Sequence, residues 1–240
     1  MSSVMSTELV LRPATAADLP ALAEIHLAAR RAAGEAFPPG VHGDDEVRAW
    51  VSGWDLSTYD VWLASSGEQV AGYARCTPTW LDDLYVHPAH QGSGVGTALF
   101  DVVTTLLPGG FCLWVFESNA PARAFYRSRG CLELERTDGA ANEERSPDIR
   151  VAWPGPDPVT FLRRLIDDVD LVLGDVLARR TALTRAVQAV KPSGERDPVR
   201  EAEIAGRVAA VAPDLGQDRV ARIVDVIISE SLAASRDDAP

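Results

Sequence analysis

Lysine is nearly absent from this chain of 240 residues, which contains 22 arginines and a single lysine, Lys191. Cysteine is also scarce, and Cys76, Cys112 and Cys131 form neither a C-x-x-C pair nor the spacing of a disulfide framework. This argues against a disulfide-stapled secreted domain and a cysteine-based metal site, and no other metal site is predicted. We expect all three cysteines to be reduced thiols in a hydrophobic core.

Excess positive charge and long apolar runs are missing as well. The formal net charge is -12, whereas a protein that grips nucleic acid or an anionic membrane needs a basic face. No segment approaches the roughly 18 apolar residues of a membrane-spanning helix, and residues 1–10 lack the basic and apolar regions of a signal peptide. We therefore expect a cytoplasmic protein that works on small molecules and binds neither nucleic acid nor membrane.

The chain is long enough for two domains, and its hydrophobic content of 46% lets each of them bury a core. Up to Trp153, short β-branched and aromatic runs alternate with helical patterns, whereas only helical periodicity follows. Three prolines within residues 154–158 exclude a continuing strand or helix interior. We predict an α+β domain over residues 1–153, a Pro-rich linker at 154–158 and an all-helical domain over 159–240.

The first domain is predicted to be a mixed sheet with flanking helices. The patterns indicate helices over 16–33, 44–54, 95–107 and 120–129, and strands over 8–12, 61–64, 69–77, 81–86, 111–116, 132–136 and 149–153.

A glycine-rich turn joins the strand that ends at Val86 to the helix that starts at Val95. Glycines at 92, 94 and 96 let the backbone approach a ligand without interference from Cβ atoms. Such a turn aims backbone N–H groups and a helix N-terminus at one point, which suits a pyrophosphate. The turn lacks a Lys-Ser/Thr ending and follows several strands, which argues against a nucleotide P-loop.

Two motifs of the first domain occur together in one known family. Gln91, Gly94 and Gly96 fit the pattern Q/R-x-x-G-x-G/A, and the run from Asn119 to Gly130 fits N-x-x-A-x-x-F-Y-x-x-x-G. Residues 8–153 thereby resemble the GNAT superfamily of acetyl-CoA-dependent N-acetyltransferases. The resemblance implies acetyl-CoA as co-substrate and an amine as acceptor, and nothing in the sequence identifies that amine.

The same resemblance implies roles for individual residues. Tyr126 would protonate the departing thiolate. The resemblance does not fix the base, because family members differ in the group that takes the proton of the amine; Asp82 and Asp83, just ahead of Leu84, are the candidates, unless they are solvated strand charges. Asn119 would hydrogen-bond near the pantetheine. The implied cofactor-binding residues are Val86, Gln91, Gly92, Ser93, Gly94, Val95, Gly96, Thr97 and Asn119.

The second domain begins with apolar residues at helical spacing from Phe161 to Val190. One helix of roughly 30 residues would be about 45 to 50 Å long, more than the width of so small a domain. Part of its apolar stripe must therefore lie on another chain, and we predict a homodimer. Two shorter helices are predicted after it, over 198–211 and from 214–218 to about 234.

Cationic side chains interrupt the apolar pattern of this domain, and several cations directed at a core need an anionic ligand. Residues 159–235 resemble the all-helical, AroQ-type chorismate mutases, which form intertwined dimers. The spacings from Arg163 to Arg180 and from Arg180 to Lys191 equal those of that family. The runs that carry the resemblance are 162–170, 179–180, Lys191, 196–201 and 227–231.

This second resemblance implies a site for a dicarboxylate. Arg180, with Arg163 of the partner subunit, would clamp the two carboxylates, because a guanidinium binds a carboxylate through two hydrogen bonds. Lys191 would donate to the ether oxygen whose bond breaks, a task for a compact charge. The implied catalytic residues are Arg163, Arg180, Lys191, Arg200 and Glu201, and the implied substrate-binding residues add Asp197, Ser231 and Ser235.

The implied reaction is the rearrangement of chorismate to prephenate, which needs neither cofactor nor metal. Ser235 stands where many members have Gln or Glu, and the loop after Lys191 is shorter than in bacterial members. Three alternatives stay open: a mutase for 4-amino-4-deoxychorismate, a lyase that eliminates pyruvate from isochorismate, and a helical module that only dimerises the acetyltransferase. We predict a bifunctional enzyme of the shikimate pathway and aromatic amino acid biosynthesis. The fusion of the two activities adds the hypothesis of a shikimate-derived amine as acetyl acceptor.

Overall fold

The structure, a computed structural model, describes residues 8–190 and 196–237. The chain divides into two compact units, Met1–Leu162 and Arg163–Pro240. The division falls inside one helix, α5 (Pro158–Val190), whose first turn belongs to the first unit. Within the described ranges, no helix combines the length and the apolar character needed to cross a bilayer.

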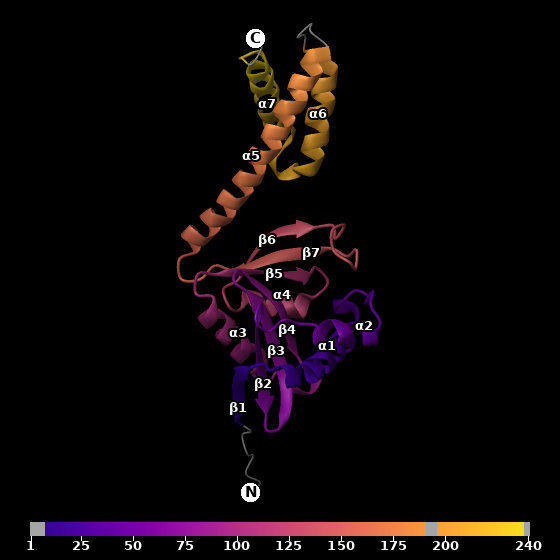
Figure 1. The fold of residues 1–240 in the computed structure, drawn as a ribbon, viewed down its shortest axis with the longest axis vertical. Coiled ribbons are helices and arrows are strands. Elements are labelled where there is room, and N and C mark those ends of the chain that lie inside the picture. The colour runs from indigo at the N-terminus through magenta and orange to yellow at the C-terminus, as the bar shows by residue number, and fades with distance from the viewer. Residues whose placement is uncertain (1–7, 191–195, 238–240) are drawn as a thin grey trace. The chain divides into compact units, whose positions relative to one another are not determined.

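A seven-stranded sheet forms the centre of the first unit (Figure 1). Neighbouring strands run antiparallel except β4 and β5, which are parallel, so the predicted mixed sheet is confirmed. The strands, in their spatial order, are β1 (Leu9–Pro13), β2 (Asp60–Ser66), β3 (Gln69–Thr77), β4 (Trp80–Val86), β5 (Phe111–Phe116), β7 (Asp148–Trp153) and β6 (Leu132–Thr137).

The two parallel strands hardly pair. A single register pair, Trp80 with Cys112, joins β4 to β5, and beyond it the strands separate. On its other side β4 carries a bulge against β3, because Arg75 pairs with Asp83 but Cys76 pairs with Leu81, which leaves Asp82 as the extra residue. Most of the edge of β4 that faces β5 is therefore unpaired. Two neighbouring carboxylates, Asp82 and Asp83, lie at the bulge.

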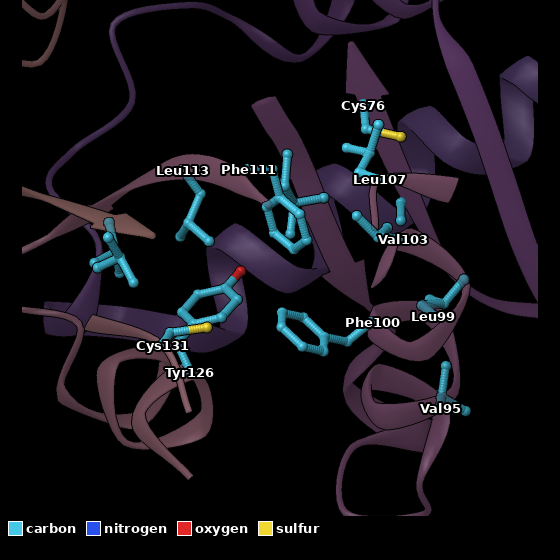
Figure 2. Packing of buried hydrophobic residues seen from close by; sticks show 14 of the residues in the cluster. Cys76, Val95, Leu99, Phe100, Val103, Leu107, Phe111, Leu113, Tyr126 and Cys131 are labelled. Atoms are coloured by element: carbon cyan, nitrogen blue, oxygen red, sulfur yellow. The ribbon is translucent and has the colours of Figure 1, made fainter. Parts of the chain in front are cut away.

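Helices cover both faces of the sheet, which gives the first unit two hydrophobic clusters. On one face, α1 (Leu19–Ala33) and α2 (Asp44–Ser52) pack on β2 and β3. On the other face, α3 (Val95–Leu106) and α4 (Ala120–Arg127) share a larger cluster with β5 and β7, part of which is shown in Figure 2. All three cysteines are buried thiols, as predicted.

The proline-rich segment before α5 packs on the first unit. Pro154 is buried, and the Asp157 carboxylate accepts a hydrogen bond from the Thr160 amide at 3.2 Å, which caps α5. Phe161, in the first turn, is only 4% exposed. Its ring occupies the space that a Cβ on Gly110 would need, and Gly110 has a φ of 90°.

The second unit consists of helices, as predicted. The 33-residue α5 is followed by α6 (Pro198–Val211) and α7 (Gln217–Asp237). A small core of the buried residues Ala205, Val220, Val224 and Ile228 joins α6 to α7, with Ile204, Ala209 and Leu232 packed against it. Large apolar residues along α5 stay exposed in the single chain: Ile166, Val169, Leu171, Val172, Leu173, Val176, Leu183 and Val187.

Candidate active sites

A cavity of about 1130 Å³ lies in the first unit where β4 and β5 separate. Four groups of residues line it: β4 with the glycine-rich turn, β5 with α4, the C-terminal part of α1, and the loop between β6 and β7. The predicted site residues that line it are Val86, Gln91, Gly92, Gly94, Gly96, Thr97, Asn119 and Tyr126. Ser93 and Val95 do not line the cavity, because Ser93 bonds the His90 carbonyl at 2.5 Å and Val95 is buried in the core.

The glycine-rich turn leaves the first amides of α3 without acceptors. Gly92 and Gly94 have φ angles of 74° and 92°, in the left-handed region that favours glycine. The first hydrogen bond of α3 runs from the Ala98 amide to the Gly94 carbonyl at 3.0 Å. The preceding helical N–H groups, from Val95 to Thr97, have no acceptor within the described residues. A helix N-terminus with unpaired donors at a cavity suits a phosphate group.

Asn119 caps α4 and lines the cavity with the same side chain. Its Oδ1 accepts a hydrogen bond from the Ala122 amide at 3.1 Å, which satisfies one orphan donor of the helix. The side-chain amide nitrogen makes no hydrogen bond within the described residues. It is therefore the group of Asn119 that can donate to a ligand.

Tyr126 is buried in α4, with 8% of its surface exposed. Figure 2 shows its ring beside that of Phe100, at a centroid distance of 6.1 Å, with the hydroxyl pointing away from the α4 backbone. No group in the described part of the chain hydrogen-bonds this hydroxyl, which lines the cavity. Burial raises the pKa of the Tyr126 phenol, so the group stays protonated at neutral pH and can donate a proton.

The two aspartates at the β4 bulge differ in environment. Asp83 is buried and accepts a hydrogen bond from Arg75 Nε at 2.5 Å, and Arg75 lies over the rings of Trp54 and Tyr59, 4.7 Å from each centroid. Asp82 is exposed to the cavity and forms no side-chain ion pair in the described ranges. The protein around the cavity nevertheless shields the Asp82 carboxylate from part of the solvent, and this desolvation raises its pKa. Asp82 is thus better suited than Asp83 to accept a proton.

The opposite side of the cavity is formed by the loop between β6 and β7, which two ion pairs hold. Glu144 accepts a hydrogen bond from Arg30 of α1 at 2.7 Å, and Glu143 contacts His42 at 2.9 Å. Asp148 is buried at the start of β7 and accepts from the Thr137 hydroxyl and from Asn142 Nδ2. Sequence reasoning missed these residues, because the Arg30–Glu144 pair spans 114 positions of the chain.

Arg129 also lines the cavity and was not predicted as a site residue. Its guanidinium lies 3.6 Å from the Phe125 ring centroid and hydrogen-bonds the Thr97 hydroxyl in the first turn of α3. The buried Nε of Arg129 has no hydrogen-bond partner in the part of the chain that the structure describes. A cation therefore stands beside the unpaired amides of α3, and the only signal for it in the sequence is its position within the second motif.

The second unit brings two of its predicted site residues together. Arg180 Nη1 donates to the Ser231 hydroxyl at 2.6 Å and to the Ile227 carbonyl at 3.2 Å. Ser231 is buried and lies one helical turn after Ile227, whose carbonyl it also contacts at 2.6 Å. The contact fixes one guanidinium between α5 and α7 and leaves its other nitrogen atoms for a ligand.

A second polar cluster surrounds the start of α6. The Asp197 carboxylate caps this helix through the amides of Val199 and Arg200, at 3.1 and 3.0 Å. Glu201 receives two hydrogen bonds from Arg196, at 2.8 and 2.6 Å, which lower the pKa of its carboxyl. Arg196, to which no role was assigned, therefore holds the Glu201 side chain in one orientation.

Arg163, Arg200 and Ser235 are not brought together with Arg180 in the described part of this unit. Arg163 is exposed and lies seventeen residues before Arg180 on the same helix, so their backbones are about 25 Å apart. Arg200 is exposed, and the Ser235 hydroxyl bonds the Leu232 carbonyl at 2.7 Å. Lys191 lies outside the described residues.

Comparisons with known proteins match each unit separately. The family model for GNAT acetyltransferases matches residues 22–131, and the model for chorismate mutase type II matches residues 162–236. No curated protein is matched.

Among solved structures, the chain is similar to the apo form of YjaB from Escherichia coli, with 21% identity and a TM-score of 0.52 over 62% of this chain and 99% of that one. It is also similar to YncA, a putative acetyltransferase from Salmonella typhimurium solved with its cofactor acetyl-CoA, with 21% identity and a TM-score of 0.51 over 62% and 95% of the chains. At this level of identity the likeness establishes the fold.

Proposed function

Residues 22–131 are a GNAT acetyltransferase domain and residues 162–236 a chorismate mutase type II domain, and we propose that this enzyme has two activities. The first domain transfers the acetyl group of acetyl-CoA to an amine. The second domain rearranges chorismate to prephenate. The functional division we propose is the α+β domain at 1–153, the Pro-rich segment at 154–158 and the helical domain from 159 onwards.

The observation that carries the first activity is the cavity between β4 and β5. It joins the unpaired amides of the glycine-rich turn, the side chain of Asn119 and the free hydroxyl of Tyr126 in one space of about 1130 Å³. The amides would hold the CoA pyrophosphate, with Arg129 adding positive charge beside them. Acetyl-CoA is also the cofactor in the YncA structure, which has the same fold.

The side chains in the cavity suit both proton transfers of the reaction. The amine nitrogen forms a bond to the thioester carbonyl carbon, and the C–S bond breaks. Asp82 takes the proton that the amine loses, and its raised pKa brings it closer to that of an ammonium group. Tyr126 gives its proton to the departing thiolate.

Titration calorimetry with acetyl-CoA on the full chain tests this assignment. We expect one binding site per chain, and we expect Gly92→Ala to weaken binding at least tenfold. The matched control is Gly216→Ala, because Gly92 and Gly216 have φ angles of 74° and 75° and both have open space around the position of a Cβ. Failure of the wild-type protein to bind acetyl-CoA, or equal effects of the two substitutions, would refute the proposal.

The observation that carries the second activity is the position of Arg180. Its contacts with Ser231 and the Ile227 carbonyl orient a guanidinium between two helices, where it would bind one carboxylate of chorismate. Arg163 lies about 25 Å away on the same helix, so it reaches this site only from a second copy. The exposed apolar residues along α5 would be covered by that copy, which makes the active form an intertwined homodimer.

The other residues would complete the site around the ring and the ether oxygen. Lys191 would donate to the ether oxygen, Arg200 would add positive potential, and Glu201 with the backbone near Asp197 would hold the ring hydroxyl. Ser231 and Ser235 would border the substrate on α7. None of these roles requires a cofactor.

Formation of prephenate from chorismate by the purified protein tests the second activity. We expect Arg180→Ala to abolish turnover and Lys191→Ala to do the same. The matched control is the neighbouring Arg179→Ala, because the Arg179 side chain is 75% exposed and pairs with Asp175, one turn away on the same helix. Turnover of 4-amino-4-deoxychorismate or isochorismate in place of chorismate would reassign the substrate, and no turnover of any of the three would leave dimerisation as the role of this domain.

A further inference from the structure

The acetyl acceptor is not identified by the motifs, but the charge of the cavity limits its chemistry. Among the described residues that line the cavity, four carry a carboxylate and one, Arg129, is cationic. Arg129 lies at the α3 end, beside Thr97. The four carboxylates, Asp82, Asp83, Glu144 and Asp148, are referred to below as the acidic wall.

Two members of the acidic wall are neutralised by ion pairs. Arg75 pairs with Asp83 at 2.5 Å and Arg30 pairs with Glu144 at 2.7 Å. Both arginines are also held by aromatic rings, because Arg75 lies over Trp54 and Arg30 lies 5.1 Å from the Phe37 centroid. These guanidinium groups are therefore committed and not available to bind an anionic substrate.

The other two members, Asp82 and Asp148, form no ion pair among the described residues. Asp82 has no ion pair in the described parts of the chain and opens onto the cavity. Asp148 is buried, and the side chains that donate to it among the described residues are neutral: the Thr137 hydroxyl and the Asn142 amide. Two carboxylates that form no ion pair among the described residues thus border one cavity, which favours a cation there over an anion.

A separate observation indicates that a ligand belongs at this place. The Tyr126 hydroxyl, on a side chain that is 8% exposed, lines the same cavity and has no hydrogen-bond partner among the described residues. This hydroxyl faces the cavity and is open to a hydrogen bond from a ligand or a water molecule. Phe37 and Phe116 also line the cavity, with their rings in edge contact at 5.6 Å, and they add apolar surface for the carbon skeleton of an acceptor.

We infer that the acceptor is an amine without a carboxylate that carries a second cationic group, such as a diamine, with Asp82 at the reacting ammonium and Asp148 opposite the second charge. The inference rests on the proposed acetyltransferase function and makes it more specific. The fusion of the two domains led to the hypothesis of a shikimate-derived amine as acceptor. The inference excludes every such amine that still carries a carboxylate. The two active sites of the chain then take substrates of opposite charge.

Matched pairs of amines test the inference, with kcat/KM measured on the full chain at saturating acetyl-CoA. Each pair differs only by a carboxylate: 1,5-diaminopentane against lysine, and 1,4-diaminobutane against ornithine. We expect each diamine to be acetylated at least tenfold more efficiently than its amino acid. Equal or better transfer to the amino acids overturns the inference, and so does a protein that binds acetyl-CoA but acetylates neither diamine.

Substitution of Asp148 tests whether its carboxylate binds the second ammonium group of the diamine. Asp148→Asn should raise KM for the diamines at least fivefold and leave the dissociation constant of acetyl-CoA unchanged. Asp101→Asn is the matched control, because Asp101 is exposed on α3 outside the cavity. An unchanged KM for the diamines in Asp148→Asn contradicts the inference. Calorimetry distinguishes failure of this inference from failure of the proposed acetyltransferase function. If the wild-type protein does not bind acetyl-CoA, the proposed function itself is refuted.

Discussion

At the scale of single residues, Tyr126 is the side chain whose environment is best matched to its proposed chemistry. It is buried and lines the cavity, its hydroxyl has no hydrogen-bond partner among the described residues, and burial raises the pKa of its phenol. A general acid of this kind typically contributes about 10²- to 10⁴-fold to the rate. The sequence predicted this residue from its place in a motif, but not the empty space around its hydroxyl.

Replacing this hydroxyl tests its role directly. We predict that Tyr126→Phe lowers kcat for acetyl transfer by about 100-fold or more and leaves the dissociation constant of acetyl-CoA within a factor of two or so. Steady-state kinetics and calorimetry measure the two quantities. Tyr59→Phe, at a tyrosine outside the cavity, serves as the control, and a Tyr126→Phe enzyme with normal kcat would exclude the hydroxyl as the proton donor.

The pH dependence of transfer reports on Asp82. The base must be ionised, and desolvation raises the pKa of Asp82, so the rate is highest above this raised pKa and falls as the pH drops through it. We predict that Asp82→Asn lowers kcat by about 10²-fold or more and removes this acid limb. If the acid limb persists at the same pH in Asp82→Asn, another group is the base.

At the scale of elements, the N-terminus of α4 combines stability and binding in one side chain. The Oδ1 atom of Asn119 caps the helix, while the amide nitrogen is free to donate into the cavity. Asn119→Asp keeps the cap and removes the donor, so we predict weaker acetyl-CoA binding with little change in the free energy of unfolding. Asn119→Ala should in addition destabilise the protein by about 1 kcal/mol.

Calorimetry and denaturant unfolding of both variants distinguish the two roles. Equal acetyl-CoA affinity in Asn119→Asp and the wild type would reduce Asn119 to a helix cap.

The long helix α5 is the second informative element. Its apolar residues Val169 and Val176 are 62% and 51% exposed in the single chain, and exposed stripes of this kind mark an interface. We predict that Val169→Glu with Val176→Glu gives a monomer by light scattering, without mutase activity but with normal acetyl transfer. The control is Val41→Glu, at an exposed valine of the first unit, and a wild-type monomer in solution would contradict the account.

At the scale of the whole molecule, the sequence predicted the fold class of both units and most of their helices and strands. These predictions used hydrophobic periodicity, the proline-rich segment and the two motifs around Gly94 and Asn119. All of these signals lie within short stretches of sequence, so they can be recognised without knowledge of long-range contacts. The acidic wall and its ion pairs were missed, since Arg30–Glu144 joins α1 to a loop that follows β6. The bulge that separates the roles of Asp82 and Asp83 was also missed, because it depends on the register with β3.

The central claim is that one chain holds two independent active sites. The most direct test measures acetyl transfer and prephenate formation in parallel on the wild type, Tyr126→Phe and Arg180→Ala. We predict that Tyr126→Phe loses acetyl transfer and keeps the mutase rate, whereas Arg180→Ala loses the mutase rate and keeps acetyl transfer. Loss of both activities in either variant, in a protein that remains folded, or the absence of either activity from the wild type, would contradict the claim.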